Sequence, residues 1–126
     1  MSYQLSFKQL RHANKTRLKS SVFEDDDWSV SDWLMAVTGE LGELANTLKK
    51  VRRGDITLAE AHHAVEAEFA DIVMYLDILA AELTVDLNRA VIAKFNIVSN
   101  RVNSDLYLNR EGELLSSPPG YGPPAI

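Results

Sequence analysis

The sequence predicts an all-α protein, and three observations lead to that prediction. The chain of 126 residues contains no proline before Pro118, so no proline interrupts a helix over most of its length. No stretch alternates apolar and polar residues for long enough to indicate a strand. Two long segments instead repeat apolar residues at steps of three and four, which is typical of a helix face. We therefore expect an antiparallel four-helix bundle.

The first helix is expected over residues 3–20, and residues 21–30 are expected to form a loop. The loop carries an acidic run that is followed by Trp28. The helix has an irregular apolar row, made of Leu5, Leu10, Ala13 and Leu18.

The second helix has the clearest signals. Ser29 and Ser31 are both good N-cap residues, so we expect the helix to start after one of them. Cations crowd its last turn, where they suit the helix dipole, and Gly54 supplies a stop. Its apolar row steps alternately by three and four, through Leu34, Val37, Leu41, Leu44, Leu48 and Val51.

Two further helices follow. Thr57 and Glu60 form a capping box, so the third helix is expected to start at Thr57 and to run to about Leu83. A fourth helix is expected from Asp86, a natural N-cap residue, to Val102. The apolar row of the third helix is Val65, Phe69, Ile72, Leu76, Leu79 and Leu83.

The length of the chain fits one domain with a modest core. We expect residues 1–109 to form a helical domain and residues 110–126 to form a Pro/Gly-rich tail without regular structure. The short connection between the second and third helices favours an antiparallel hairpin. A hairpin with two flanking helices leaves apolar surface uncovered, so we expect the bundle to be completed by oligomerisation.

Composition and charge exclude several classes of function. The chain is 46% hydrophobic and 25% charged, which argues against global disorder. Its net charge of −5, without a basic block, argues against binding to a nucleic acid polymer. It has no cysteine, no apolar run of membrane-spanning length, and an N-terminus without the apolar core of a signal peptide. We therefore expect a soluble, cytoplasmic protein that does not interact with a membrane.

The most informative feature is a pair of acidic phrases, one in each long helix. Glu40 and Glu43 lie three residues apart, and so do Glu68 and Asp71. Residues at this spacing share one helix face, so a hairpin would let all four carboxylates meet beside its apolar seam. A hard divalent cation such as Mg²⁺ takes oxygen ligands and relieves the repulsion among them. The two pairs therefore predict a metal site, although solvated helix edges are the ordinary alternative for each pair alone.

The sequence evidence for a second kind of metal site, a di-iron site, is weaker. Glu60 and His63 lie three residues apart, as in di-iron carboxylate bundles, but those bundles need two such pairs and this chain has one. Glu60 is also explained by its capping box, so we expect His62 and His63 to be exposed.

Several other side chains could bind a substrate. Trp28 and Trp33 flank the start of the second helix and could stack on a nucleobase, although core packing is the commoner role. Tyr75 lies one turn after Asp71 and could line the same cavity. Lys94 in the fourth helix could meet a phosphate oxygen, or simply face solvent.

At these residues the chain resembles the MazG-like all-α nucleoside triphosphate pyrophosphohydrolases, which include dimeric dUTPases and dCTP pyrophosphatases. The resemblance covers residues 28–103, with E-x-x-E at Glu40 and Glu43 and E-x-x-D at Glu68 and Asp71. Gly39 precedes Glu40 where many members carry a second acid, a version similar to the dCTP-pyrophosphatase branch. Residues 85–102 resemble the fourth-helix segment of the family, with matches at Asp86, Lys94, Asn100 and Arg101.

The resemblance implies Mg²⁺-dependent hydrolysis of a (d)NTP to a (d)NMP and pyrophosphate, with Mn²⁺ as a possible substitute. It implies catalytic and metal-binding roles for Glu40, Glu43, Glu68 and Asp71. The expected substrate-binding residues are Lys94, Asn100, Arg101, Trp28, Trp33 and Tyr75. It also implies a homodimer or homotetramer with a role in cleaning the nucleotide pool. The alternative is a non-catalytic helical oligomeric interaction module, in which the acids are merely solvated.

Overall fold

The computed structural model describes residues 2–20 and 28–120, and it confirms the all-α fold. Within these residues there are four helices and two strands of two residues each. The elements, in chain order, are α1 (Phe7–Leu18), α2 (Val30–Arg53), α3 (Leu58–Glu82), α4 (Leu87–Arg101), β1 (Tyr107–Leu108) and β2 (Leu114–Leu115). Most of the expected loop, residues 21–27, lies outside the described residues.

Local capping decides where the helices begin and end. Ser29 caps α2 as expected, Thr57 caps α3 in a capping box with Glu60, and Asp86 caps α4. The N-cap of α1 is Ser6, so the first helix is shorter than the expected residues 3–20. Gly54 ends α2 with a φ of 80°, a left-handed conformation that glycine adopts without steric cost.

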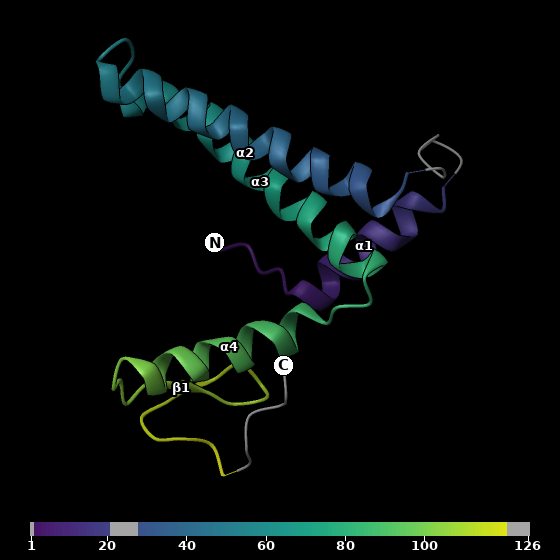
Figure 1. The fold of residues 1–126 in the computed structure, drawn as a ribbon, viewed down its shortest axis with the longest axis vertical. Helices are drawn as coiled ribbons and strands as arrows, with labels where there is room; N and C mark the ends of the chain where they lie inside the picture. The colour runs from purple at the N-terminus through teal and green to yellow at the C-terminus, as the bar shows by residue number, and fades with distance from the viewer. Residues whose placement is uncertain (1, 21–27, 121–126) are drawn as a thin grey trace. The chain divides into compact units, whose positions relative to one another are not determined.

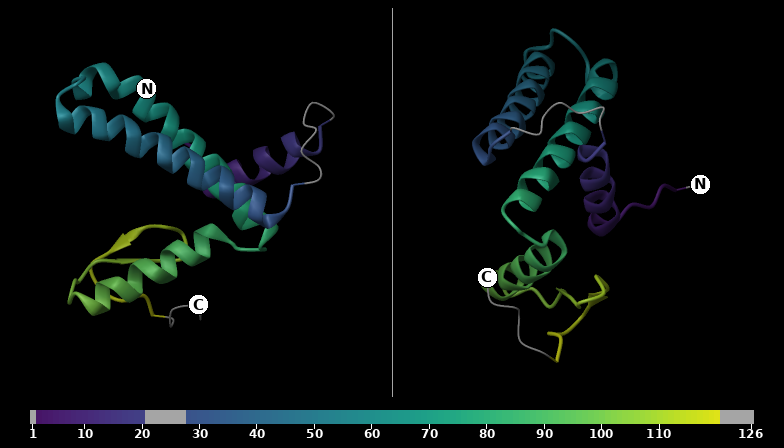
Figure 2. Two further views of the ribbon diagram at one scale, coloured as in Figure 1. Left: turned by 45° about the horizontal axis from the view of Figure 1, so that its top comes forward. Right: turned by 90° about the vertical axis from the view of Figure 1, so that its right-hand side faces the viewer.

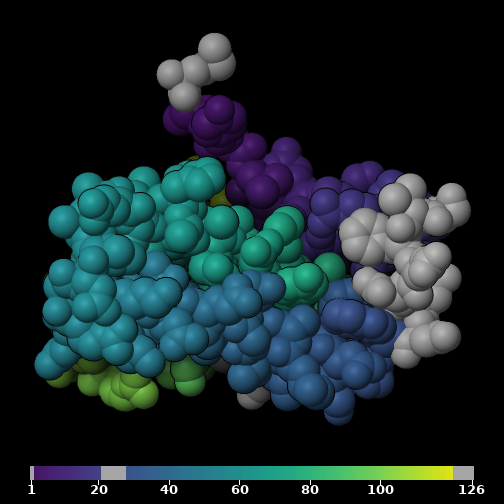
Figure 3. Space-filling view, turned by 90° about the horizontal axis from the view of Figure 1, so that it is seen from above, coloured from purple at the N-terminus to yellow at the C-terminus, as the bar shows by residue number. Residues whose placement is uncertain are grey.

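The chain divides into two compact units, residues 1–84 and residues 85–126. In the first unit α2 and α3 run antiparallel as a long hairpin, which confirms the expected pairing (Figure 1). The two helices stay side by side in the other ribbon views and in the space-filling view, where they form one continuous surface (Figures 2 and 3). Helix α1 packs on α3.

The seam of this hairpin differs from the expected apolar rows. Glu40 and Glu68 are themselves half-buried and belong to the seam, instead of lying beside it. The seam on α2 follows a three-four spacing through residues that are all buried or half-buried, namely Trp33, Val37, Glu40, Leu44, Thr47 and Val51. The corresponding residues on α3 are Ala61, Val65, Glu68, Ile72, Tyr75 and Leu79.

Half of the expected row residues lie outside the seam. We call them the outer rows: Leu34, Leu41 and Leu48 on α2, and Phe69 and Leu76 on α3 with its C-cap residue Leu83. All six are between 41% and 55% exposed. The expected rows were wrong in this respect, because each long helix carries two neighbouring apolar stripes and one hairpin partner covers only one of them.

The core of the first unit lies where the three helices meet. Trp33, Ile78 and Leu79 are buried together there, and Leu18 of α1 packs against them with Val37 of α2 and Tyr75 of α3. This core fixes the end of the hairpin against which α1 packs, and the site described below adjoins it.

The second unit is built around α4 and a small hairpin. The buried side chain of Asn96 donates to the carbonyl of Leu108 at 2.9 Å and accepts from its N–H at 2.8 Å, which fixes β1 along the helix. Strand β2 pairs antiparallel with β1, with Tyr107 opposite Leu115. Regular structure therefore continues beyond residue 109, where the sequence indicated only a tail. Whether residues 1–109 act as one domain stays a prediction.

None of the helices in residues 2–20 and 28–120 is both long and apolar enough to cross a membrane.

Candidate functional site: an acidic cluster in the helical hairpin

Three of the four predicted acids meet inside the hairpin. One carboxylate oxygen each from Glu40, Glu68 and Asp71 lies within 4.8 Å of the other two. All three side chains are half-buried. Among the described residues these three are the group of acidic or histidine side chains that could hold a metal ion.

The helix geometry explains why these acids meet. Glu68 lies in the seam of α3 and faces Glu40 in the seam of α2, and Asp71 follows Glu68 on the same helix face. Glu43 is exposed and lies outside the group of three, but its charge still acts on Glu68. The structure therefore brings together three of the predicted ligands and places the fourth at the edge of the cluster.

Glu68 carries the clearest electrostatic signature of the site. Burial raises its pKa to about 7, with further contributions from a shared hydrogen bond with Glu40 and from the charges of Glu43 and Glu40. Its Oε2 atom is buried and has no hydrogen-bond partner. A buried carboxylate oxygen without a partner is costly, so this atom suits a ligand that brings positive charge.

A hard divalent cation fits these residues. Carboxylate oxygens are the ligands that Mg²⁺ and Mn²⁺ favour, and the cluster offers three of them within mutual reach. A bound cation would also satisfy Glu68 Oε2 and relieve the like-charge repulsion. Histidine side chains do not join this cluster: His62 is exposed and its Nε2 lies 3.7 Å from Glu66 Oε2. Glu60 caps α3 and accepts a hydrogen bond from the N–H of Thr57.

The predicted aromatic residues form a row next to this cluster. The ring centroids of Trp28 and Trp33 lie 4.6 Å apart, and those of Trp33 and Tyr75 lie 6.2 Å apart. Trp33 is a core residue with 3% exposure, whereas Trp28 is 37% exposed. Of the two tryptophans, Trp28 is thus the one with a free face for stacking, and the substrate-binding role of all three rings stays a prediction.

A cavity of about 90 Å³ adjoins both the aromatic row and the acids. Its wall includes Trp33 of α2 together with Asp71 and Tyr75 of α3. The polar side of the cavity comes from α1, through Asn14 and Arg17. Asp71 therefore belongs to the acidic cluster on one side and to this cavity on the other.

The remaining predicted site residues lie in the second unit. Lys94 and Arg101 are exposed on α4. The Oδ1 atom of Asn100 accepts a hydrogen bond from the hydroxyl of Tyr107 at 2.7 Å, so this side chain has a structural partner. Their roles in substrate binding stay predictions.

Three residues of this region were missed from the sequence. Asp77 is fully buried and accepts hydrogen bonds from Arg11 Nε at 2.9 Å and from Asn14 Nδ2 at 3.0 Å. Two signals were present in the sequence: Asp77 is a lone acid within the apolar run of residues 72–81, and Asn14 follows Leu10 by one helical turn on the same face. Arg17 of the cavity carried no signal of its own.

Fold and site together define an all-α protein with a carboxylate cluster that could hold a divalent metal ion. The comparison with known proteins points in the same direction. The chain is 31% identical over 102 residues to dCTP pyrophosphatase 1 of Rattus norvegicus, a match that covers 75% of this chain and 59% of that protein. The chain thus spans less than two thirds of the length of the relative. No protein-family model matches the sequence.

Proposed function

We propose that this protein is a divalent-cation-dependent nucleoside triphosphate pyrophosphohydrolase. The observation that carries the proposal is the convergence of Glu40, Glu68 and Asp71 in the hairpin, with an unpartnered buried oxygen on Glu68. The similarity to a dCTP pyrophosphatase supports the same reaction class. Water adds across the bond between the α- and β-phosphates, which leaves a nucleoside monophosphate and pyrophosphate.

Each acid has a proposed role in that reaction. Glu40, Glu68 and Asp71 hold the cation, and Glu43 at the edge of the cluster orients or deprotonates the attacking water. When bound, Mg²⁺ or Mn²⁺ would offset the negative charge that develops on the phosphates and lower the pKa of the attacking water. Lys94, Asn100 and Arg101 are proposed to contact the polyphosphate, while Trp28, Trp33 and Tyr75 form a wall for the base.

We also propose that the active protein is a homodimer or homotetramer. The outer rows place three large apolar side chains at seven-residue spacing on each of two antiparallel helices, and one chain leaves them exposed. Seven-residue spacing is the repeat with which one helix packs against another in a coiled coil, so a second copy of the same hairpin fits this surface. The proposed setting is the cytoplasm, with cleaning of the nucleotide pool as the role.

A screen of the common (d)NTPs tests the proposed reaction. Each nucleotide is incubated with the protein and Mg²⁺, and the products are separated by ion-exchange chromatography. We expect a monophosphate and pyrophosphate from at least one substrate, and no turnover in EDTA. Formation of a diphosphate and orthophosphate would show that a different phosphate bond is cut and that the reaction is assigned wrongly.

The exposed outer rows also favour a second candidate, a helical interaction module without catalysis. The two candidates differ in their response to ligands, because only the enzyme binds Mg²⁺ and nucleotide in its folded state. A melting temperature that rises with both together favours the enzyme. A melting temperature that changes with neither Mg²⁺ nor nucleotide, in a protein that still oligomerises, favours the interaction module.

A further inference from the structure

The end of α2 carries four cations, and the helix period places one of them on the side of the acidic cluster. These cations are Lys49, Lys50, Arg52 and Arg53. Lys50 follows Glu43 by seven residues, which is close to two full turns, so the two residues share one side of α2. Arg52 follows Glu43 by nine residues, or two and a half turns, and therefore lies on the opposite side.

The side chain of Lys50 is free to meet a ligand. It is exposed, and within residues 2–20 and 28–120 it makes no hydrogen bond and no ion pair. Arg53 in the same turn differs, because its guanidinium pairs with Asp55 Oδ2 at 2.8 Å. Helical side chains lean toward the N-terminus of their helix, so Lys50 leans back along α2 toward Glu43. Seven residues correspond to about 10 Å along the helix axis, a distance that the long lysine side chain shortens.

Small residues flank the acids on the side of the hairpin that carries Glu43 and Asp71, which we call the acid side. Gly39 precedes Glu43 by four residues on α2, so the two share one face. Ala64 precedes Asp71 by seven residues on α3 and shares its face in the same way. Gly39 and Ala64 are both exposed. Beyond its own stretch of α2, no described residue comes within 4 Å of the place where a Cβ of Gly39 would stand. A large ligand can therefore reach the carboxylates from the acid side.

The outer rows do not obstruct this approach. Leu41 precedes Glu43 by two residues, which turns it by about 200° around α2. Phe69 precedes Asp71 by two residues and is turned around α3 by the same amount. The outer rows therefore lie across the seam from the acid side, and a second copy that covers them leaves the acid side open.

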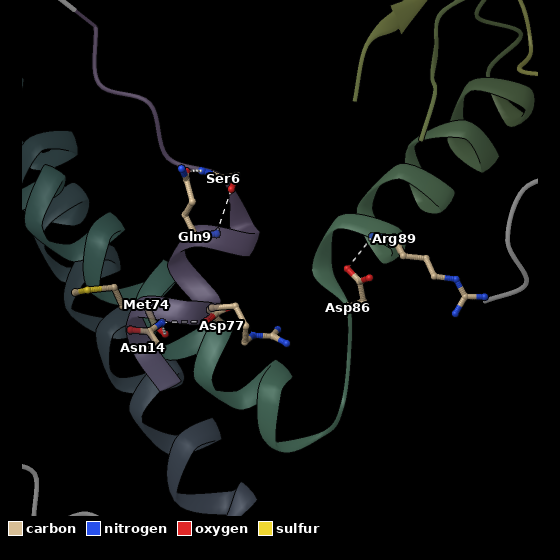
Figure 4. A network of polar contacts seen from close by, with 8 residues as sticks. Ser6, Gln9, Asn14, Met74, Asp77, Asp86 and Arg89 are labelled. Atoms are coloured by element: carbon tan, nitrogen blue, oxygen red, sulfur yellow. Dashed lines mark hydrogen bonds and ion pairs between the residues drawn. The ribbon is translucent and has the colours of Figure 1, made fainter. Parts of the chain in front are cut away.

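The opposite end of the acid side holds aromatic rings and α1. Figure 1 shows α1 at the end of the hairpin that lies away from the connection between α2 and α3. Helix α1 is fixed there by Asn14, whose amide donates to Asp77 Oδ2 at 3.0 Å (Figure 4). Trp33 and Tyr75 line the cavity at this end together with Asp71. The acids therefore lie between an aromatic end and a cationic end of the same hairpin.

We propose that Lys50 is a substrate-binding residue that contacts the terminal phosphates of the nucleotide. The inference rests on the proposed function, which supplies a polyphosphate at the acids. It also gives the nucleotide a direction along the hairpin, with its base toward Trp33 and Tyr75 and its last phosphate toward Lys50. The charge has a physical purpose, because a triphosphate beside four carboxylates needs more positive charge than a divalent cation alone provides. An ammonium group on a flexible stem binds phosphate as a point charge and needs no rigid geometry.

Another reading explains Lys50 through helix stability. Lys50, Arg52 and Arg53 all lie in the last turn of α2, where any cation interacts favourably with the helix dipole. Arg52 is also exposed and makes no hydrogen bond or ion pair with the described part of the chain. Because Arg52 lies on the far side of α2 from Glu43, Arg52→Gln is a matched control for Lys50→Gln. Lys50→Arg is a third variant, which keeps a positive charge on the acid side.

The test measures binding of inorganic triphosphate to the protein by isothermal titration calorimetry, with Mg²⁺ and about 0.15 M salt present. This probe carries three phosphates without a base, so it does not depend on the identity of the nucleotide. We expect Lys50→Gln to weaken binding by about tenfold, which is the size of a lost charge-assisted hydrogen bond. Lys50→Arg should bind nearly as wild type does. Arg52→Gln should do the same, because this salt concentration screens exposed charges that lie more than about 8 Å apart.

The outcomes separate this inference from the proposed function. If Lys50→Gln loses binding at an unchanged melting temperature while Lys50→Arg keeps it, the inference is supported, even in a protein that hydrolyses no nucleotide. If Lys50→Gln and Arg52→Gln bind triphosphate equally, or if wild type does not bind it, the inference is overturned whatever the (d)NTP screen shows. A loss of binding that Lys50→Arg shares in full, or that comes with a fall in melting temperature absent from Arg52→Gln, overturns it as well.

Discussion

Glu40 of α2 and Glu68 of α3 face each other within the seam of the hairpin, with carboxylate oxygens less than 4.8 Å apart. Val37 and Leu44 lie one turn before and one turn after Glu40 in the same seam. An apolar side chain in place of either acid would continue the seam and add to its stability. The hairpin therefore carries a destabilising layer at its centre, which is typical of a site kept for function.

The first prediction concerns the four acids. Glu40→Gln, Glu43→Gln, Glu68→Gln and Asp71→Asn keep the size of each side chain but remove its negative charge. We expect each variant to lose about 100-fold or more in kcat/KM, because losing a metal ligand or the proposed base removes several kcal/mol of transition-state stabilisation. Circular dichroism should show unchanged helix content.

Glu66→Gln is the control for this series. Glu66 lies on α3 between His62 and the cluster, but its side chain is 72% exposed and pairs only with His62 among the contacts described. Turnover of Glu66→Gln should match that of wild type. Near-normal turnover in two or more of the four cluster variants would place the active site elsewhere.

The second prediction follows from the raised pKa of Glu68. In the metal-free protein this pKa is about 7, against 4.5 for the ordinary side chain. Between these two values the folded state holds a proton that the unfolded state has released, so this group makes the free energy of unfolding fall as pH rises. The stability that this raised pKa contributes is fully present below pH 4.5 and is lost as pH rises through 7.

Urea unfolding in EDTA at pH 5 and at pH 8 measures this effect. Glu68→Gln mimics the protonated acid at both pH values. The free energy of unfolding of this variant should therefore exceed that of wild type at pH 8 and lie closer to it at pH 5. Asp105→Asn, an exposed acid of the second unit, is expected to show no such difference. An equal effect of Glu68→Gln at both pH values would mean that Glu68 is charged throughout this range.

The third prediction concerns the outer rows. We expect the purified protein to be a dimer or tetramer at micromolar concentration, as measured by light scattering. Leu48→Glu and Leu76→Glu place charges in the outer rows and should shift the mass toward that of one chain, 14.1 kDa. Leu58→Glu, at the start of α3 and outside both rows, should leave the mass unchanged. A wild-type protein that is monomeric and fully active would overturn the proposal of an interface.

The sequence predicted the helices, and the meeting of three of the four acids, because both depend on local rules. Caps at Ser29, Thr57 and Asp86 and a period of three and four residues are visible along the chain, and the spacing of Glu68 and Asp71 already places both on one face. The choice between two adjacent apolar stripes is different, because it depends on which neighbour each helix meets. Leu41 and Phe69 were therefore assigned to the seam although Glu40 and Glu68 occupy it.

The α1 side of the site was beyond prediction for a similar reason. Asn14 and Asp77 are separated by 63 residues, and each has an ordinary local explanation on a helix. The two residues form a hydrogen bond only because α1 packs against α3. The same packing brings Arg17 to the wall of the cavity. Long-range polar pairs leave no periodic trace in the sequence.

The last prediction tests the polar anchor between α1 and α3. Asp77 is fully buried and paired with Arg11, whose side chain is 24% exposed. Asp77→Asn removes the buried carboxylate to which Arg11 Nε and Asn14 Nδ2 donate, and we expect the free energy of unfolding to fall by about 3 kcal/mol. The exposed pair of Arg53 and Asp55 is the control, and Asp55→Asn should cost at most about 1 kcal/mol. The double variant Arg11→Gln, Asp77→Asn should recover part of the loss, because it removes both charges of the ion pair together. Urea unfolding of all variants at pH 7 decides the matter, and equal costs at Asp77 and Asp55 would show that α1 is held by its apolar contacts alone.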